Sequence, residues 1–403
     1  MQVNALAPSP IDATATDESP VQPCFAVGDD RLTLLDTGPR RFAAMLELIG
    51  NARRSLRLLY YIYADDASGR RIKEALIAAA GRGVTVSVVL DGFGCDAPAD
   101  FFAGLTDAGA SVCRFEPRWG RRFLLRNHQK LALADAETAD ARIIVGGFNI
   151  ADDYFGGEAD GAWRDLGLLV EGPTAARLQG YFDALGEWVR DPRPLLRRLN
   201  RTLKQWSEPE GRTRWLIGGP MRRLSPWARA VRADMRRAAR IDMVAGYFTP
   251  SPTMLRHLSR AGRRGREVRI VTAARSDNTA TIAAARFTYA GLLRKGVRIF
   301  EYGPAKLHTK LYAIDDIVHI GSANFDMRSL FINLELMLRV DDPAFATHVH
   351  TYVDSEIARS EAITVDDHRA RTGVVTRVRQ FLAYIMVGVV DPGVSRGINL
   401  GPS

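Results

Sequence analysis

Short apolar runs alternate with amphipathic stretches along most of the chain. Residues 42–52 and 68–80 have the spacing of helices that bury one face, whereas 56–63 and 84–90 are mainly apolar runs of the length of buried strands. A glycine-rich turn at 81–83 ends the second helix before the next strand begins. Strands that alternate with helices in this way predict an α/β fold.

The same order of elements returns in the second half of the chain. Helices are expected at 226–239 and 252–264, and strands at 241–248 and 267–272. Each half continues with another helix, a short strand and a strand that carries a His-x-Lys sequence. The two histidines of these sequences lie about half a chain apart, so the pattern predicts the duplication of a domain-sized unit.

This duplication divides the chain into five expected segments. Residues 1–23 are rich in Ala, Pro, Ser, Thr and Asp and have no hydrophobic periodicity, so a disordered tail without the features of a signal peptide is expected. Two domains are expected at 24–190 and 224–362, joined by a basic linker at 191–223. Residues 363–403 are expected to be a C-terminal tail with an amphipathic helix.

The apolar part of the C-terminal tail leaves two alternatives. Residues 381–390 are too short a run to cross a bilayer, and no other segment reaches the roughly 18 to 20 apolar residues that a spanning helix needs. The helix either docks in a membrane interface behind Arg377 and Arg379 or packs onto the core of the second domain.

Positive charge is concentrated between the two expected domains. Residues 190–240 contain fifteen basic and four acidic residues, a net charge of +11 in a chain whose total is +9. Such a surface suits an anionic partner, either phospholipid headgroups or nucleic acid, and a solvated helix face is the simpler alternative. Trp206, Trp215 and Trp227 in this segment either lie at the level of lipid headgroups or pack between helices.

Lysine is scarce in this arginine-rich chain, and two of the lysines form a repeated pattern. Each of the two stands two positions after a histidine and five positions before an aspartate, and a glycine-containing turn with an asparagine follows. Because residues i and i+2 of a strand point to the same face, each His and its Lys are expected to project together. The two sets are His128, Lys130, Asp135, Gly147 and Asn149 in the first half and His308, Lys310, Asp315, Ser322 and Asn324 in the second.

These residue types suit phosphoryl transfer. Two lysines, two asparagines and Ser322 can hold phosphate oxygens and the charge that grows on a five-coordinate phosphorus, and Gly147 allows close approach of the backbone. One neutral imidazole can attack the phosphorus while the other, protonated, gives a proton to the leaving oxygen. Asp165 and Glu335 are the candidates to fix the tautomers of the rings. No metal or other cofactor is expected, because no Cys/His or carboxylate cluster suggests one.

The duplicated His-x-Lys-x4-Asp signature resembles that of the phospholipase D superfamily, over about residues 32–360. The resemblance implies two α/β/α sandwich halves related by a pseudo-two-fold axis, with both signatures meeting at one shared active site. It also implies a phosphohistidine intermediate, with His128 as the nucleophile and His308 as the general acid and then base. By the same pattern the two candidate carboxylates orient the rings. Asp135 and Asp315 belong to the catalytic signature, but their expected role is structural rather than chemical.

Within the superfamily the sequence is most similar to bacterial cardiolipin synthases. The similarity lies in residues 146–154, in Trp163-Arg164-Asp165, and in 321–329, which ends in Asp-Met-Arg-Ser. It implies a phosphatidyl transferase that makes cardiolipin from phosphatidylglycerol at an anionic membrane surface. The expected location is cytoplasmic and peripheral at the inner face of the cell membrane, and three cysteines without metal-ligand spacing agree with a reducing compartment.

Other functions stay open at this point. A phospholipase D-type hydrolase, a phosphatidylserine synthase, a superfamily nuclease or a non-catalytic protein of the same fold would share the signature. Nucleic acid is the less expected partner, and the sequence decides neither the oligomeric state nor the acceptor of the phosphatidyl group.

Overall fold

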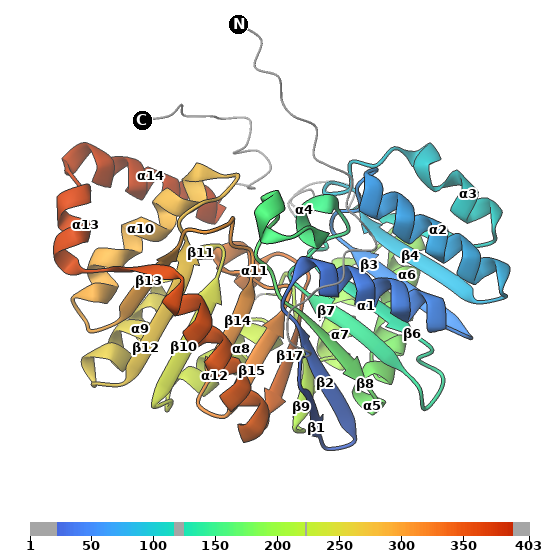
Figure 1. The fold of residues 1–403 in the computed structure, drawn as a ribbon, viewed down its shortest axis with the longest axis horizontal. Coiled ribbons are helices and arrows are strands. Elements are labelled where there is room, and N and C mark those ends of the chain that lie inside the picture. The colour runs from blue at the N-terminus through green and yellow to red at the C-terminus, as the bar shows by residue number, and fades with distance from the viewer. Residues whose placement is uncertain (1–21, 117–124, 222–223, 390–403) are drawn as a thin grey trace, which may run out of the picture.

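Each half of the chain builds its own eight-stranded sheet (Figure 1). The computed structural model describes residues 22–116, 125–221 and 224–389, so the expected tail at 1–23 lies almost wholly outside the described residues. The strand order is β1-β2-β8-β7-β6-β3-β4-β5 in the first sheet and β18-β13-β12-β10-β14-β15-β17-β9 in the second. The elements of the first half are β1 (Cys24–Val27), β2 (Asp30–Leu35), α1 (Gly38–Asn51), β3 (Ser55–Tyr60), α2 (Ala67–Gly81), β4 (Thr85–Asp91), α3 (Ala103–Asp107), β5 (Ser111–Phe115), β6 (Leu131–Ala134), β7 (Arg142–Gly146), α4 (Asp152–Phe155), β8 (Gly167–Glu171), α5 (Pro173–Ala176) and α6 (Gln179–Arg190).

The second half repeats this topology. Strands β2, β8, β7, β6, β3, β4 and β5 correspond in order to β9, β17, β15, β14, β10, β12 and β13, and β1 and β18 are additional edge strands at opposite ends. The duplicated α/β architecture expected from the sequence is therefore confirmed. The elements of the second half are α7 (Leu196–Gln205), β9 (Thr213–Gly218), α8 (Pro226–Met235), β10 (Arg240–Ala245), β11 (Phe248–Thr249), α9 (Pro252–Arg263), β12 (Glu267–Ala273), α10 (Thr279–Leu293), β13 (Arg298–Tyr302), β14 (Lys310–Ile314), β15 (Ile317–Gly321), β16 (Phe325–Asp326), α11 (Met327–Phe331), β17 (Glu335–Asp341), α12 (Pro343–Ala358), β18 (Ser360–Ile363), α13 (Val365–Arg371) and α14 (Val374–Val389).

Side-chain caps fix where several helices begin. Thr37, Asp66, Ser225 and Ser251 precede α1, α2, α8 and α9, and each accepts a hydrogen bond from a backbone N–H of the first turn. The strand expected at 241–248 is divided into β10 and β11. A Cβ on the intervening Gly246 would lie 2.4 Å from the carbonyl oxygen of Leu307, so the missing side chain admits the chain that leads into the second His-x-Lys sequence.

The segment at 191–223 is more than the linker that the sequence suggested. It contains α7 and β9, and β9 pairs antiparallel with β17 as an edge strand of the second sheet. The second structural unit therefore begins at β9 and not at residue 224. The basic composition of this segment hid a strand whose partner, β17, lies more than a hundred residues further along the chain.

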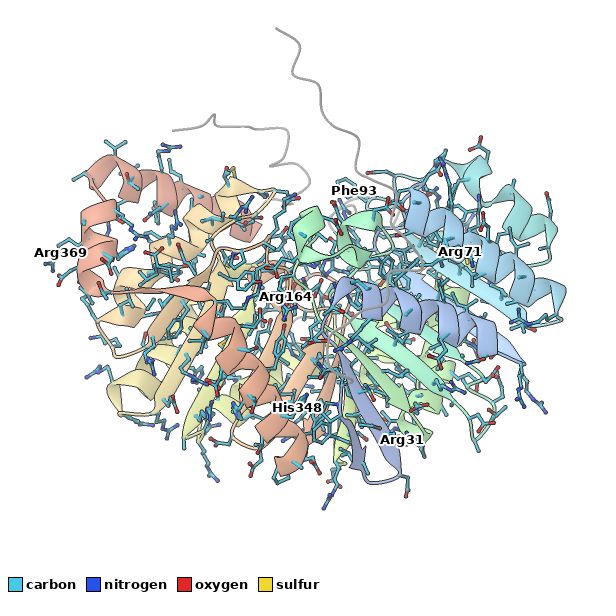
Figure 2. The ribbon with its side chains drawn as sticks, in the orientation of Figure 1. Arg31, Arg71, Phe93, Arg164, His348 and Arg369 are labelled. Carbon is cyan, nitrogen blue, oxygen red and sulfur yellow. The ribbon has the colours of Figure 1, made fainter. Side chains whose placement is uncertain are left out.

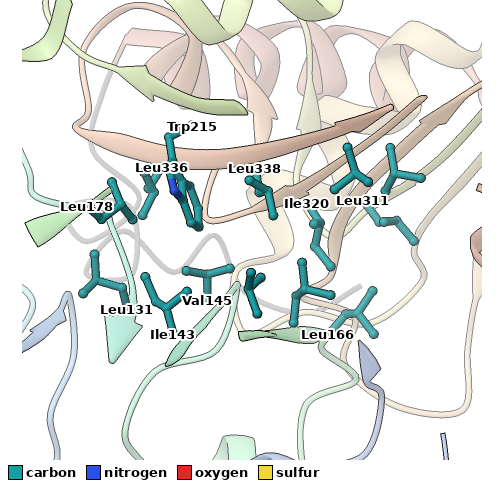
Figure 3. Close-up of a cluster of buried hydrophobic side chains, with 14 of the residues drawn as sticks. Leu131, Ile143, Val145, Leu166, Leu178, Trp215, Leu311, Ile320, Leu336 and Leu338 are labelled. Carbon is teal, nitrogen blue, oxygen red and sulfur yellow. The ribbon is translucent and has the colours of Figure 1, made fainter. Parts of the chain in front are cut away.

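A single apolar layer joins the two halves (Figure 3). Because side chains alternate along a strand, one face of each sheet points to the other sheet and the opposite face points to helices. Leu131, Ile143 and Val145 of the first half pack in the shared layer, whereas Ala132 and Ile144 of the same strands pack in the cluster under α1 and α2. The residues of the shared layer from the second half include Leu311, Ile320, Leu336 and Leu338.

The tryptophans of the basic segment belong to the interior. Trp215 and Trp227 are 1% and 0% exposed, and Trp206 is half-buried against the shared layer. Trp215 donates from its indole N–H to the carbonyl of Thr174 at 2.8 Å. For Trp215 and Trp227 the placement at lipid headgroups is therefore wrong and packing was the correct alternative, and Trp206 also packs on the shared layer. Among the described residues, no helix has the length and apolar character that crossing a bilayer requires.

Candidate active site

Backbone hydrogen bonds bring the two His-x-Lys sequences together across the pseudo-two-fold axis. The N–H of His128 donates to the carbonyl of Leu334 at 3.0 Å, and the N–H of His308 donates to the carbonyl of Arg164 at 2.8 Å. Leu334 and Arg164 each directly precede one of the candidate carboxylates. Each histidine is thus aligned in register with a carboxylate from the opposite half of the molecule.

The side chains repeat this crossed arrangement. The Nδ1 of His308 lies 2.6 Å from Oδ2 of Asp165, and the Nδ1 of His128 lies 3.1 and 3.2 Å from the two carboxylate oxygens of Glu335. Both carboxylates are fully buried. With Nδ1 turned to a carboxylate, Nε2 is the ring nitrogen that is left for chemistry. The sequence named both carboxylates but could not tell which ring each would hold.

The two lysines lie buried next to their histidines, and neither is among the residues that line the cavity. Lys130 donates to the carbonyl of His128 at 2.7 Å, and Lys310 donates to the carbonyl of His308. Each lysine is 1% exposed. Burial is the main reason why the pKa of Lys310 is lowered to about 8 and that of Lys130 lies well below its ordinary value. In their protonated forms, two lysines next to one site attract a phosphate strongly.

Corresponding positions after the His-x-Lys strands differ between the halves. Gly147 occupies one of them, where a Cβ would lie 2.5 Å from Oδ1 of Asp165, so only glycine fits against that carboxylate. Its counterpart Ser322 donates its hydroxyl to Oε2 of Glu335 and accepts from the N–H of Leu336. The Ser322 proton is therefore directed to Glu335 and not into the cavity, which differs from the phosphate contact that the sequence suggested.

Asparagines from both halves reach the site. Asn149 and Asn324 line the same cavity as the two histidines and are 2% and 5% exposed. The Oδ1 atom of Asn149 accepts from the N–H of Ile62 at 3.2 Å. This arrangement orients its NH₂ group as a donor, which is the property that phosphate binding needs.

The first His-x-Lys sequence lies just before β6 and the second ends at the first residue of β14, so neither lies within its strand as the sequence suggested. Asp135 and Asp315 directly follow the same strands, at the ends away from the imidazoles. The carboxylate of Asp135 accepts from the backbone N–H groups of Arg53, Arg54 and Ser55 at distances from 2.7 to 3.1 Å. Asp135 and Asp315 are the two non-glycine residues with positive φ in the described chain, at 51° and 50°. Each closes the turn after its strand in a conformation that Asp tolerates better than most residues.

Asp135→Ala is expected to lower the free energy of unfolding by about 2–4 kcal/mol, because three backbone donors lose a charged acceptor and alanine disfavours positive φ. Denaturant unfolding followed by circular dichroism measures this change. Asp140→Ala, in the exposed part of the same turn, should alter stability by less than about 0.5 kcal/mol. A stable Asp135→Ala protein without activity would show that Asp135 has a chemical role.

The two imidazoles open onto one cavity of about 420 Å³. The wall around His308 is aromatic. The ring centroids of Tyr154, Trp163 and Tyr247 lie 5.3 to 5.8 Å from the centroid of the imidazole, in edge-to-face arrangements. The remaining wall is mainly polar. Its residues include Tyr61, Arg126, Asp326, Arg328 and Asn333.

Sequence reasoning missed several residues of the cavity wall and of its surroundings. Nothing in the chain pattern singled out Tyr61 or Tyr247. Ser329, which donates to Oε1 of Glu335 at 2.7 Å, stood in the Asp-Met-Arg-Ser continuation, where a positional signal existed but no role was assigned. Asp326 of the same continuation caps α11, and burial raises its pKa to about 6.

Burial sets the protonation of the catalytic groups. It lowers the pKa of both His128 and His308, and the adjacent lysines lower them further, against the opposing effect of the carboxylates. Although burial opposes it, Lys310 and His308 hold the pKa of Asp165 below its ordinary value. Before substrate binds, both rings are therefore neutral near pH 7 and at least one carboxylate is charged.

Comparisons with known proteins agree with this geometry. The profile of the family described as "Cardiolipin synthase, PLD-like domain" matches residues 45–185 and 232–357. Over 357 residues, the chain is 32% identical to cardiolipin synthase A of Pseudomonas fluorescens strain Pf-5, a match that covers 86% of this chain and 72% of that protein. It is also 32% identical over 358 residues to cardiolipin synthase A of Pseudomonas putida strain W619, with the same coverage.

A solved structure shows the same fold. The crystal structure of phosphatidylserine synthase from Haemophilus influenzae Rd KW20 superposes with a TM-score of 0.66 at 12% identity, covering 94% of this chain and 97% of that one. The duplicated sheets, the crossed imidazole–carboxylate pairs and these matches lead to one conclusion. The chain belongs to the cardiolipin synthase, phospholipase D-like domain family and is an enzyme of the phosphatidyltransferase kind.

Proposed function

We propose that this enzyme makes cardiolipin by transferring a phosphatidyl group from one phosphatidylglycerol to a hydroxyl of a second, with release of glycerol. The observation that carries the proposal is that two imidazoles, each held at Nδ1 by a carboxylate from the other half, line one cavity and have two buried lysines close to them. The names of the similar proteins, which are cardiolipin synthases, support cardiolipin as the product.

The first chemical step assigned to this site forms a phosphohistidine. The Nε2 of His128 attacks the phosphorus as the bond from phosphorus to the glycerol oxygen breaks, and His308 gives its Nε2 proton to the departing glycerol. Lys130, Lys310 and Asn149 stabilise the charge on the non-bridging oxygens. Glu335 keeps the attacking ring in the tautomer with a free Nε2 lone pair, and Asp165 stabilises the protonated His308.

The second step reverses the roles of the proton groups. Neutral His308 takes the proton from a hydroxyl of the second phosphatidylglycerol while its oxygen attacks the phosphorus and the bond to His128 breaks. Transfer rather than hydrolysis requires the cavity to favour that hydroxyl over water. The mainly polar wall that includes Asp326, Arg328 and Asn333 offers donors and acceptors suited to a glycerol headgroup.

The proposal is tested with purified protein and phosphatidylglycerol in detergent mixed micelles, with a chelator present. Cardiolipin and glycerol in equal amounts are expected. Phosphatidic acid as the main product would show that the enzyme hydrolyses the lipid and does not transfer the phosphatidyl group. Cut single-stranded DNA with unchanged lipid would show that the substrate is nucleic acid. Either result, or turnover of neither substrate, contradicts the proposal.

The pH dependence follows from the lowered pKa values of both imidazoles. Catalysis needs one protonated and one neutral ring, and when both pKa values lie below about 6.5 that form becomes rarer as the pH rises. We therefore expect kcat/KM to fall by up to about tenfold per unit between pH 6.5 and 7.5. A bound phosphodiester anion favours the protonated ring, so kcat should begin to fall only at higher pH.

Lys310→Met provides the check on this assignment. After burial, the charge of Lys310 is the largest cause of the lowered pKa of His308. Its removal should therefore move the falling limb of kcat/KM to higher pH, although the rate itself decreases. A limb that does not move would show that another group is the proton donor.

A further inference from the structure

Helix α14 carries most of the exposed apolar surface of the described chain. Ten large hydrophobic side chains are exposed among the described residues, and six of them lie on this one helix. Val374 is 83% exposed, and Leu382 is 60% exposed. The six are Val374, Val375, Val378, Phe381, Leu382 and Ile385. Contiguous apolar surface of this kind indicates an interaction site.

The exposed side chains form a stripe on a helix whose opposite side is already packed. At 3.6 residues per turn the six positions fall within an arc of about 120°. On the other side, Ala383, Tyr384 and Val387 are buried in a cluster with Ala284 of α10. The hydroxyl of Tyr384 donates to the carbonyl of Pro250 at 2.7 Å. The helix is therefore fixed to the domain, and within the stripe Phe381 also contacts Phe287 of α10, with ring centroids 5.4 Å apart.

The charged residues beside the stripe indicate an anionic partner. Arg377 and Arg379 are exposed, and on the same helical projection they lie at the two edges of the apolar arc. No acidic residue occurs between Val374 and Val389. An apolar stripe bordered by arginines matches the interface of an anionic bilayer, where acyl chains receive the apolar side chains and the guanidinium groups reach phosphates. With 16 residues, or about 24 Å, the helix is too short to span that bilayer.

The position of α14 relates this stripe to the active site. The helix contacts α11, whose last residue, Phe331, is 37% exposed and lies two residues before Asn333 of the cavity wall. Phe93 belongs to the cavity wall and is 47% exposed. Figure 1 shows α14 at the upper edge of the second half, and Figure 2 shows Phe93 at the upper edge of the molecule over the first half. Exposed apolar groups thus occur on both sides of the cavity.

We propose that the exposed stripe of α14, together with Phe331 and Phe93, docks on an anionic phospholipid bilayer and holds the mouth of the catalytic cavity at its surface. This inference rests on the proposed function, because a diacylated substrate must present its headgroup to the cavity while its acyl chains stay in the membrane. Docking parallel to the surface is the mode that the helix length permits.

The test separates docking from catalysis. Binding to vesicles of phosphatidylglycerol and phosphatidylcholine is measured by sedimentation, and turnover is measured separately in detergent mixed micelles. Leu382→Ser/Ile385→Ser is expected to weaken vesicle binding by about 100-fold, since two large side chains no longer enter the apolar layer. Micellar turnover should stay within about twofold of the unchanged protein, because neither residue touches the cavity.

Two further variants make the result specific. Arg377→Gln/Arg379→Gln should weaken binding about 30-fold on anionic vesicles and leave binding to pure phosphatidylcholine unchanged. Leu195→Ser, at an exposed leucine in the connection before α7, is the matched control and should bind like the unchanged protein. Because all these side chains are exposed, the melting temperature of each variant should stay within a few degrees of that of the unchanged protein.

Several outcomes would overturn docking. The unchanged protein could fail to bind anionic vesicles, or Leu382→Ser/Ile385→Ser could bind as well as Leu195→Ser. A concentration-dependent dimer that the double serine variant abolishes would assign the stripe to a second copy of the chain. Absence of micellar turnover with intact vesicle binding would instead contradict the proposed function alone, so the two failures are distinguishable.

Discussion

His128→Ala is expected to abolish formation of the phosphoenzyme and to lower kcat by at least about 10⁴-fold. His128 supplies the Nε2 that forms the covalent bond, whereas His308, the equivalent imidazole of the other half, is assigned to proton transfer. The measurement uses phosphatidylglycerol labelled at phosphorus, quenched in the steady state, with protein-bound label counted. Label trapped on the His128→Ala protein would show that the order of the two histidines is reversed.

His308→Ala is the matched variant, because it removes the same side chain from the other half. It should still form the phosphoenzyme, but slowly, since the glycerol oxygen then leaves without a proton. A donor lipid with a nitrophenol leaving group needs no such proton. That donor should restore the first step in His308→Ala and not in His128→Ala. Equal behaviour of the two variants toward the nitrophenyl donor would contradict the separate roles.

Asp165→Asn is expected to lower kcat by about 10³- to 10⁴-fold, the second of the large effects. The short contact of 2.6 Å between Asp165 and His308 holds the ring, and an amide at that place can neither enforce the tautomer nor stabilise the protonated imidazole. If Asp165 acts through His308 in this way, the nitrophenyl donor should recover most of the first step. A variant that stays inactive toward that donor would indicate a structural defect instead.

Glu335→Gln is the appropriate comparison and should lose less activity than Asp165→Asn. His128 lies further from its carboxylate, at 3.1 and 3.2 Å, and Ser322 and Ser329 both donate to the same carboxylate. Because the two hydroxyls also bind the carboxylate of Glu335, its negative charge acts less strongly on His128 than the charge of Asp165 acts on His308. A larger loss in Glu335→Gln would mean that the orientation of His128 limits the rate.

The chain pattern was sufficient for the fold class, for the duplication and for the two His-x-Lys sequences. Buried strands such as β4 are mainly apolar runs, and the neighbouring helices have one apolar face, so local periodicity encodes them directly. The same holds for Asp135 and Asp315, whose spacing from the lysines marked them. Their contacts with backbone N–H groups, however, appear only in three dimensions.

The tertiary structure alone decided which surfaces and side chains meet. Periodicity states that a face is buried, but it does not name the partner, because the partner lies far away in sequence. For this reason the sequence predicts a linker where β9 lies, and it does not decide which carboxylate holds His128 and which holds His308. It also assigns no role to Ser329. The two alternatives for α14, docking in a membrane interface and packing on the domain, had equal standing in the sequence. The structure shows that the helix packs on one side and exposes apolar residues on the other.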